Sequence, residues 1–387
     1  MQLSLRTNVL ILSHFYKRTI SGGGPPQDIR DYLIPKIKNI YYIEHPFPSA
    51  DDRRSSLSIY KNGILKTKIF SPKIYGPEIL FYLIDFLITF YFIFRSKKRF
   101  ELCIALDNLN TVSVLPFRWL RIIKKLVYYT IDYTPQRFKN ATLNSLYHLI
   151  DRVACYHADR IWVLSERMIT AREKNGVNPQ KSAKNILLPM GANLSRIEIL
   201  PLTKINRHEV AFVGFLMEKQ GVQFVLKSLP KIILKIPNFK FIIIGDGDYK
   251  QKLVDLTKKL KIGKHVLFKG FINDYKIVEN ILCKSAVGVA PYVPTPENYT
   301  FYADPGKIKL YLGCGLPVVL TNVPKIAHVI KSKKAGIVID YSEKSFVKNL
   351  VKLLSDKKLY KKYRKNAIEL SKTYDTNVLI NKALNKT

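Results

Sequence analysis

The sequence predicts an α/β protein with two doubly wound domains that face a cleft. Single domains cluster at roughly 100–200 residues, so a chain of 387 residues is expected to hold two of them. Hydrophobic residues make up 47% of the chain, which is enough to fill two cores. Short apolar runs alternate with helical patterns in both halves, and this alternation is typical of parallel sheets covered by helices.

The first half, residues 1–200, is expected to form the N-terminal domain. A glycine loop at Gly22–Gly24 follows its first strand, and a polar helix begins near Gln27. Residues 51–70 are polar and are expected to be rich in loops. The predicted strands of this domain are Val9–Ser13, Ile40–Ile43, Leu102–Leu106, Leu126–Ile131 and Arg160–Ser165.

One apolar segment, Ile79–Phe94, is long enough to raise the question of a membrane span. It is shorter than the roughly 20 residues that a spanning helix needs, and Asp85 lies in its middle. The basic run Arg95–Arg99 follows it, which suits a helix that lies on a membrane surface. Two interpretations stay open: a core helix of the first domain, which is favoured, and a helix at a membrane surface.

The second half, residues 205–372, is expected to form a C-terminal domain after a polar linker at 200–207. The last part of the chain, at about 373–387, is expected to be a helix that packs back on the N-terminal domain. Predicted helices cover Val222–Ile236, Lys250–Leu260, Lys276–Cys283 and Lys307–Leu312. Predicted strands are Val210–Val213, Phe239–Ile244, Val266–Phe268, Val287–Ala290, Pro317–Leu320 and Gly336–Ile339.

The charge of the chain is strongly positive, because 64 Lys and Arg residues oppose 29 Asp and Glu residues, a formal net charge of +35. A lysine-rich compositional bias explains such a charge without any function. Attraction to anionic lipid or to an anionic substrate is the main alternative. A nucleic-acid-binding protein also fits the charge, but the sequence holds no recognised nucleic-acid-binding module, which disfavours that partner.

The cysteines and the start of the sequence both indicate a cytoplasmic protein. None of the four cysteines belongs to a CxxC pair and all lie in apolar stretches, so buried free thiols in a reducing compartment are predicted. The first residues, Met1–Arg6, lack the basic flank and the apolar run of a signal peptide. Peripheral contact with the inner face of the membrane stays open as an addition to this localisation.

Strand-end glycines followed by a basic residue point to an anion site in the second half. Gly214 ends a predicted strand, and Lys219 and Gly221 come shortly after it. Backbone N–H groups together with one ammonium suit a diphosphate, although a solvated lysine at a helix start is the alternative. Gly245-Asp-Gly247 ends the next strand and is better explained as a tight turn from strand to helix.

The richest stretch of the sequence is Tyr302–Val319. Asp304 is expected to cap the helix that follows, and Pro305 suits its first position. The free N–H groups at Gly306 and Lys307, with the ammonium of Lys307, would then form an anion site. The glycine loop of the first domain does not match the GxGxxG dinucleotide pattern, so a plain flexible loop explains it equally well.

Five segments of the second half stand in the order found in one enzyme family. They are VGFLMEKQGV at 213–222, IIIGDG at 242–247, VLFKG at 266–270, AVGVAPY at 286–292 and PGKIKLYLGCGLPVV at 305–319. On these segments the chain resembles the retaining glycosyltransferases of the GT-B fold, in family 4, also called glycosyltransferase group 1. In the first half, only the glycine loop, YHADRIWVLS at 156–165 and LPMG at 188–191 match.

The resemblance implies two Rossmann-like domains, of which the second holds a nucleotide-sugar donor. Gly214 and Lys219 would lie at the donor diphosphate, and Gly306 and Lys307 at its phosphates and sugar. Phe271, in the loop after the third strand of this domain, would touch the base. Such enzymes keep the anomeric configuration and normally use neither a metal nor a cofactor, because helix N-termini and basic side chains take the place of the metal.

The sequence departs from the family pattern at several positions. Phe215 stands where the family usually has an arginine. The two glutamates of the family are missing, since Tyr302 and Leu310 occupy their places, and Asp304 is expected to replace the earlier one in part. A histidine that the family often places near the transferred sugar falls at Asp132, which is therefore expected to be the catalytic residue.

Residues of the first domain are assigned on fewer matching positions. Asp132 would orient the sugar or the acceptor, or stabilise positive charge at the anomeric carbon, although a strand-end aspartate that caps a turn is the alternative. Asp107, at the end of another strand, is a weaker candidate for that role. Gly23 and Gly24, in the glycine loop, are assigned to the donor site.

The sequence thus favours a hexosyltransferase that moves a sugar, with retention, from a nucleotide-sugar donor to a glycan or lipid-linked acceptor. Polysaccharide biosynthesis is the process that such a reaction implies, and an anionic membrane surface stays open as a further partner. A non-catalytic member of the same fold that binds a sugar nucleotide is the first alternative, and the missing glutamates favour it. A basic nucleic-acid-binding protein and a sugar-nucleotide epimerase of the same fold are the others.

Overall fold

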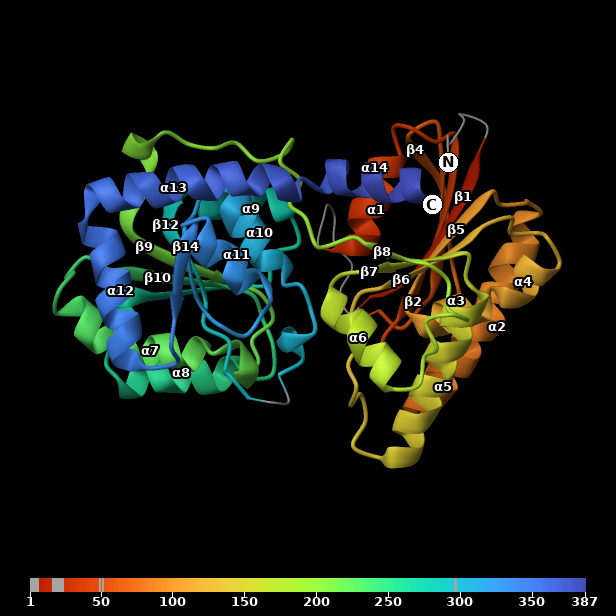
Figure 1. The fold of residues 1–387 in the computed structure, drawn as a ribbon, viewed down its shortest axis with the longest axis horizontal. Helices are drawn as coiled ribbons and strands as arrows, with labels where there is room; N and C mark the ends of the chain where they lie inside the picture. Colours follow the sequence, from red (N-terminus) through yellow and green to blue (C-terminus); the bar gives the residue numbers. More distant parts are fainter. Residues whose placement is uncertain (1–6, 16–23, 49, 51, 296–297) are drawn as a thin grey trace. The chain divides into compact units, whose positions relative to one another are not determined.

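The computed structural model describes residues 7–15, 24–48, 50, 52–295 and 298–387. The chain divides into two compact units, which Figure 1 colours from red to blue along the sequence. Unit 1 holds Met1–Pro189 and Asn377–Thr387, and unit 2 holds Met190–Thr376. Each unit contains a sheet with helices packed against it, which confirms the predicted α/β class with two doubly wound domains.

The strands of unit 1 include every strand that the sequence predicts for the first half, within a few residues of the expected bounds. Those described are β1 (Asn8–Phe15), β2 (Asn39–Pro46), β3 (Ser56–Lys61), β4 (Ile64–Phe70), β5 (Leu102–Leu106), β6 (Leu126–Thr130), β7 (Arg160–Val163) and β8 (Asn185–Leu187). They form one sheet of order β4-β3-β2-β1-β5-β6-β7-β8. β1 pairs in parallel with both β2 and β5, so the sheet extends in two directions from the first strand.

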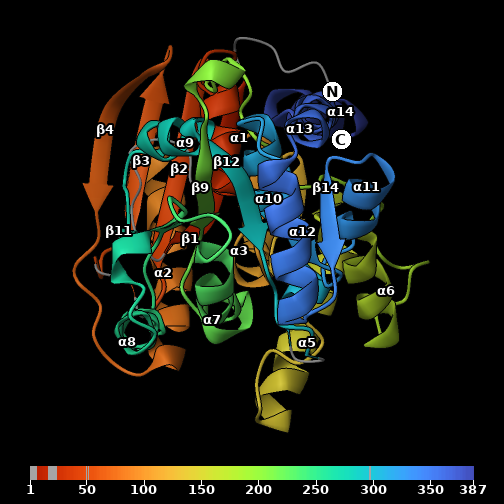
Figure 2. The same cartoon turned by 90° about the vertical axis from the view of Figure 1, so that its left-hand side faces the viewer.

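The expectation that residues 51–70 are rich in loops is wrong. β3 and β4 form an antiparallel hairpin that extends the sheet beyond β2, and Figure 2 shows β4 at its outer edge. Asn62 and Gly63 make the tight turn between the strands, with φ of 49° and 83°, as short hairpin turns require. β4 is an edge strand whose residues are mostly exposed, so its polar side chains hide the strand signal.

The helices of unit 1 include one from the very end of the chain. Those described are α1 (Pro25–Leu33), α2 (Glu78–Ser96), α3 (Asn108–Ser113), α4 (Leu115–Trp119), α5 (Ala141–His157), α6 (Glu166–Lys174) and α14 (Thr376–Lys386). Hydrogen bonds attach the last segment to the rest of unit 1. The hydroxyl of Tyr32 donates to Asn381 Oδ1 at 3.0 Å, and Trp162 Nε1 donates to Thr387 Oγ1 at 3.0 Å.

Helix α2 contains the apolar segment for which the sequence left two interpretations open. None of the helices in the described ranges is both long and apolar enough to cross a membrane. Phe81 and Phe92 are fully buried, while Leu83 and Leu87 are well exposed. The helix therefore has a core face and an open face, so the favoured core interpretation accounts for only one side of it.

All four cysteines are free and buried, which confirms the prediction of unpaired interior thiols. They are Cys103, Cys155, Cys283 and Cys314. Burial raises the pKa of the Cys155 thiol to about 12. A thiol that stays protonated in this way is a poor nucleophile, so Cys155 has a packing role.

Unit 2 contains all the strands and helices that the sequence predicts for the second half. Its strands are β9 (Asn206–Val213), β10 (Lys240–Ile244), β11 (Val266–Gly270), β12 (Ser285–Ala290), β13 (Val318–Thr321) and β14 (Gly336–Ile339), in the order β11-β10-β9-β12-β13-β14. Its main helices are α7 (Val222–Ile233), α8 (Lys250–Lys259), α9 (Tyr275–Lys284), α10 (Gly306–Gly313), α11 (Ile326–Ser332), α12 (Glu343–Ser355) and α13 (Lys357–Ser371).

Both faces of the unit 2 sheet are covered. Along β9, Val210 and Phe212 belong to one apolar core, whereas Ala211 and Val213 belong to another on the opposite face. Each recorded pairing between strands of this sheet is parallel. A strand that is buried on both faces reads as a continuous apolar run, which is why these strands were predictable.

The boundary between the units lies earlier than the polar stretch 200–207 that the sequence suggests as a linker. Several hydrogen bonds tie residues 190–200 to distant residues of unit 2. Met190 N donates to Asp304 Oδ2 at 2.8 Å, and Ala192 N donates to the Tyr374 carbonyl at 2.9 Å. Arg364 Nη2 donates to the Leu200 carbonyl at 2.7 Å. Because these partners lie far apart in the sequence, the linker composition gave no sign of them.

Candidate functional site

Three neighbouring strands of unit 2 end in glycine at the same edge of the sheet. Gly214 follows β9, Gly245 follows β10, and Gly270 ends β11. Gly214 N donates to the Ile244 carbonyl at 2.9 Å, and Gly245 N donates to the Gly270 carbonyl at 2.8 Å. In doubly wound sheets, ligands bind outside the carboxyl ends of the strands, so these three loops define the candidate site.

The backbones of these loops approach one another closely. A Cβ atom at Gly245 would collide with the Gly214 carbonyl oxygen, and one at Gly247 would lie 2.5 Å from the Leu216 carbonyl oxygen. Both glycines have positive φ, 138° and 153°. These contacts support the interpretation of Gly245-Asp-Gly247 as a tight turn. At Gly214, where φ is 139°, the nearest atom to an added Cβ would be Lys307 Nζ at 2.8 Å.

The ammonium of Lys307 lies over the end of β9. It donates to Gln220 Oε1 at 2.7 Å and sits 3.9 Å from the centre of the Phe212 ring. The residue as a whole is half-buried, but its charged end is enclosed, and burial lowers the pKa of Lys307 to about 7. Among the described residues it has no carboxylate within ion-pair distance, so an anion that binds here would stabilise its charged form.

A second lysine stands next to this group. Lys219 precedes Gln220 in a 3-10 turn, Glu218–Gln220, and its Nζ lies 4.2 Å from the centre of the Tyr299 ring. Burial lowers the pKa of Lys219 as well, and the described part of the chain offers it no carboxylate partner. Its carbonyl accepts from Val293 N at 3.1 Å, which holds this turn against the loop after β12. Lys219 and the Gln220 that binds Lys307 thus belong to one turn, which follows the end of β9.

Helix α10 brings its N-terminus to the same place. The helix starts at Gly306 with Pro305 as N-cap, and no side chain caps it. Within the described ranges, the N–H groups of Gly306 and Lys307 make no recorded hydrogen bond. A helix N-terminus carries partial positive charge and free N–H donors, so this end could accept an anion.

The prediction that Asp304 caps this helix is wrong. Its carboxylate pairs with the ammonium of Lys309 and also accepts from Met190 N at 2.8 Å. Lys309 is fully buried, and a buried ammonium needs a counter-ion close to it. Asp304 therefore neutralises Lys309 and holds the backbone at Met190 in place, so its role in the structure is to position these segments.

The remaining predicted residues of unit 2 lie at the same sheet edge or in the core. Phe271 follows Gly270 and is exposed, as is Phe215 after Gly214. Leu310, where the family resemblance expects a ribose-binding carboxylate, is buried in an apolar core instead. That position therefore supplies no polar group for a ligand.

Of the predicted site residues of unit 1, the structure describes Asp132 and Gly24. Asp132 follows β6, and its Oδ2 accepts from Arg137 Nη1 at 2.7 Å in an exposed local ion pair. This contact fits the interpretation of a turn-stabilising aspartate and leaves the carboxylate open to solvent. Gly24 is the N-cap of α1, and Gly23 lies outside the described residues.

Sequence reasoning missed a buried charged cluster in unit 1 that is centred on His14. Nδ1 of His14 lies 2.7 Å from Asp107 Oδ2, and Nε2 lies 3.4 Å from Asp85 Oδ2. Burial alone would lower the pKa of His14, but the two carboxylates outweigh it and raise the pKa to about 10. His14 is therefore an imidazolium held between two aspartates at the carboxyl end of β1.

Asp107 has an unusual backbone conformation that belongs to this cluster. Its φ is 86°, a region that L-residues rarely occupy and that costs about 1–3 kcal/mol. Oδ1 accepts from Asn110 N at 2.8 Å and caps α3, while Oδ2 binds His14. The only sequence signals were the charge of Asp85 within an apolar helix and the aspartate at the end of β5.

Comparison with known proteins matches the second half of the chain to one family. Residues 207–356 match the sequence model of the family described as "Glycosyl transferases group 1". An uncharacterized glycosyltransferase of Methanocaldococcus jannaschii is 31% identical over 165 residues, which are 42% of this chain and 39% of that protein. The match thus covers less than half of the length of that relative.

Solved structures are similar over the whole chain. Sucrose-phosphate synthase from Thermosynechococcus elongatus has a TM-score of 0.73 at 14% identity, over 98% of this chain and 99% of its own. The Anabaena protein HepE, solved in complex with UDP-glucose, has a TM-score of 0.67 at 14% identity, over 99% of this chain and 100% of its own. At such identities the likeness is one of fold.

Proposed function

We propose that this chain, whose residues 207–356 belong to the group 1 glycosyltransferases and which has the GT-B fold, transfers a sugar from a nucleotide-sugar donor to an acceptor. Unit 2 holds the donor in this proposal. The observation that carries it is the set of positive groups at one strand end: the ammonium groups of Lys219 and Lys307 and the free N–H groups that open α10. A diphosphate is the anion that such a set suits.

The residues of this site would act on the leaving group of the reaction, which is the nucleoside diphosphate of the donor. As the bond between the sugar and the diphosphate breaks, negative charge grows on the phosphate oxygens. Lys307 and the N-terminus of α10 are already in place to stabilise that charge, so little reorganisation is needed at the moment of reaction. Retention of the anomeric configuration is part of the proposal and follows the family pattern.

The base of the donor is proposed to lie against Phe271, at the end of β11. Aromatic side chains offer a flat apolar face on which a base can stack. UDP-glucose is the first donor to test, because HepE, of the same fold, binds it.

The acceptor is proposed to be a glycan or a lipid-linked glycan bound by unit 1 near a membrane surface. Asp132 is retained as the candidate residue that orients the acceptor or the sugar, because its carboxylate is solvent-exposed at the end of β6. The pairing with Arg137 is a local ion pair of the kind that contributes little, so a ligand can displace it.

A panel of UDP-, GDP- and ADP-sugars tests the donor site directly. A donor that binds the folded chain raises its melting temperature by mass action, and the preferred base is expected to stand out. The Lys307→Met variant is expected to lose this shift, whereas Lys227→Met, at an exposed position of α7, is expected to keep it. A panel in which no sugar nucleotide raises the melting temperature contradicts the proposal.

A non-catalytic donor-binding protein is the second candidate. Leu310 favours it, because an apolar side chain stands where the family resemblance places a carboxylate. Release of free UDP over time in the presence of donor separates the two functions. A donor that binds but is never consumed, with any acceptor fraction supplied, favours the non-catalytic candidate.

A further inference from the structure

Helix α2 carries a row of large apolar side chains on its exposed face. We call this row the α2 stripe; it consists of Leu80, Leu83, Leu87, Tyr91 and Phe94. Each is between 38% and 67% exposed. Their spacing of three or four residues places them on one side of the helix, one above the other.

The helix cannot turn this stripe into the core. Its opposite face is fixed by Phe81 and Phe92, which are fully buried. His45 adds two polar contacts, from Nε2 to Thr89 Oγ1 at 2.9 Å and from Nδ1 to Asp85 Oδ1 at 3.2 Å. Rotating α2 to bury the stripe would break these contacts and expose Phe81 and Phe92, so the stripe stays on the surface.

The end of α2 adds positive charge and a tryptophan to this surface. Phe100 N donates to the Ile122 carbonyl and Lys124 N donates to the Phe100 carbonyl, both at 2.8 Å, which places the two segments around these residues side by side. Their exposed side chains, which we call the basic rim, are Arg95, Lys97, Lys98, Arg99, Trp119, Leu120, Arg121 and Lys124. The basic rim adjoins the stripe, since the rings of Phe94 and Phe117 are 5.2 Å apart.

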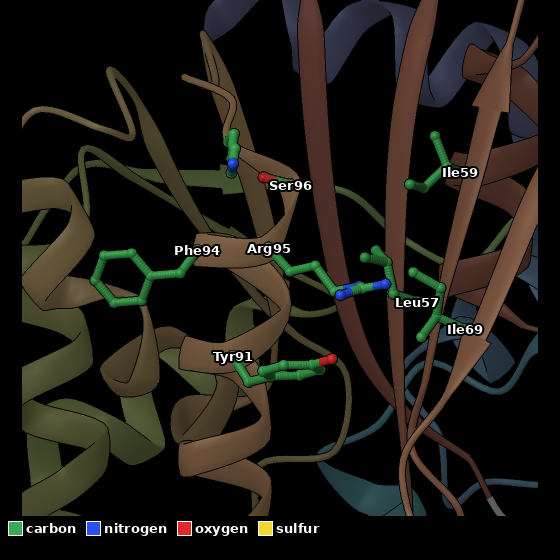
Figure 3. A pocket seen from close by; sticks show the side chains of 8 residues that line it. Leu57, Ile59, Ile69, Tyr91, Phe94, Arg95 and Ser96 are labelled. Carbon is green, nitrogen blue, oxygen red and sulfur yellow. The ribbon is translucent and has the colours of Figure 1, made fainter.

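A groove runs beside the same end of the helix. It has a volume of about 500 Å³ and lies between α2 and the hairpin of β3 and β4. Figure 3 shows Tyr91 and Arg95 reaching from α2 toward Leu57 and Ile69, while Phe94 points away. The groove is thus lined mainly by apolar side chains, with the guanidinium of Arg95 among them, a combination that suits an amphiphile with an anionic head.

We infer that the α2 stripe and the basic rim form a docking surface for a membrane that contains anionic phospholipid. The apolar side chains would enter the boundary between headgroups and acyl chains, with Trp119 at the level of the headgroups. The lysines and arginines would contact lipid phosphates, each contributing about a fivefold gain in partitioning. A nucleic acid would satisfy the basic rim but leave the leucines exposed, so the lipid surface fits better.

This inference rests on the proposed function in one respect: a lipid-linked acceptor would explain why a transferase docks on a membrane. Its physical basis lies in unit 1, whereas the donor site lies in unit 2. Binding to vesicles and binding of a nucleotide can therefore be measured separately on one preparation.

Flotation of the full chain with vesicles tests the inference. Vesicles of phosphatidylcholine with phosphatidylglycerol are expected to carry the protein, and vesicles of phosphatidylcholine alone are not. Leu83→Ser with Leu87→Ser, and separately Lys97→Glu with Lys98→Glu, are expected to lower the bound fraction at least about tenfold. Two matched controls are expected to leave it unchanged: Leu146→Ser with Leu149→Ser in α5, and Lys357→Glu with Lys358→Glu in α13.

Three outcomes would overturn the inference. In the first, the wild-type chain does not float with anionic vesicles, although a sugar nucleotide still raises its melting temperature, which shows that it is folded. In the second, the controls lose binding as strongly as the stripe variant. The third outcome is a dimer by light scattering that the stripe variant turns into a monomer, which would make the stripe a contact between two copies of this chain.

Discussion

His14 shows how far a buried side chain can depart from its behaviour in water. Its imidazolium is held by Asp107 and Asp85, which raise its pKa to about 10 from a usual value of 6.5. A raised pKa stabilises the folded state fully below the unfolded value. We therefore expect His14 to contribute fully to the stability of unit 1 below about pH 6.5, and this contribution to fall as the pH rises toward about 10.

Urea unfolding across this pH range, followed by tryptophan fluorescence, measures the effect, because Trp119 and Trp162 both lie in unit 1. His14→Gln should be less stable than wild type by about 3 kcal/mol at neutral pH, since it leaves two buried carboxylates without their cation. Its stability should also lose the pH dependence above pH 6.5. Equal pH profiles for the two proteins would refute this account of the cluster.

Lys307 has the opposite effect on the folded state. Burial lowers its pKa to about 7 from 10.5, so the unfolded chain binds the proton more strongly. Its destabilising effect is complete below about pH 7 and fades as the pH rises toward 10.5. Lys307→Met is therefore expected to stabilise the ligand-free protein by on the order of 1 kcal/mol at pH 7, measured by urea unfolding. A clear loss of stability in this variant would show that Lys307 has a structural role.

Single residues were predictable from the sequence only where a local pattern marks them. Gly214 and Lys307 stand in such patterns, one at a strand end and the other at a helix start. His14 stands within a strand, and its partners Asp85 and Asp107 come from a distant helix and another strand. Contacts of this kind form only when the sheet is assembled, so no local sequence pattern predicts them.

At the scale of the element, the turn after β9 depends on the lack of a side chain at Gly214. An added Cβ would lie 2.8 Å from Lys307 Nζ, at a residue whose φ is 139°. We expect Gly214→Ala to lower the free energy of unfolding by about 1–3 kcal/mol, to displace the ammonium and to weaken nucleotide binding at least about tenfold.

Gly263→Ala is the matched control for this prediction. Gly263 lies in the same unit, and an added Cβ there meets no atom within 4 Å. Thermal unfolding and nucleotide titration of both variants give the comparison. If Gly214→Ala behaves as Gly263→Ala does, the close approach of Lys307 to the strand end is of no consequence.

Elements were predicted well where one physical signal dominates. Buried strands such as β9 read as apolar runs, and all of those in unit 2 were found. Of the missed hairpin, β4 is an exposed edge strand that alternates polar and apolar residues weakly. The start of α10 was predicted, but its cap was not, since Asp304 turned out to serve the buried Lys309.

At the scale of the whole molecule, the chain returns to unit 1 at its end. Ile380, Ala383 and Leu384 of α14 are buried there, and Tyr32 and Trp162 hydrogen-bond to this last segment. A chain that ends at Asp375 is expected to lose about 3 kcal/mol or more of the stability of unit 1. The tryptophan fluorescence transition in urea measures this loss, and an unchanged midpoint would show that α14 is dispensable.

The division into two units was predictable from length and composition, whereas its boundary was not. Length and alternation predict two α/β domains because each domain needs a core of its own. The boundary at Pro189 and Met190 depends on hydrogen bonds from residues 190–200 to distant parts of unit 2. The glycosyltransferase class was predicted from the ordered motifs in unit 2. The identity of the acceptor and the linkage formed depend on surfaces that no sequence motif describes.

Lys307 and the N-terminus of α10 are proposed to hold the donor diphosphate. Calorimetric titration of UDP-glucose, one pH unit below and one above the Lys307 pKa of about 7, tests this proposal most directly. The account predicts proton uptake on binding, weaker binding at the higher pH, and loss of both effects with at least about tenfold weaker binding in Lys307→Met. Equal affinity of wild type and Lys307→Met at both pH values would contradict it.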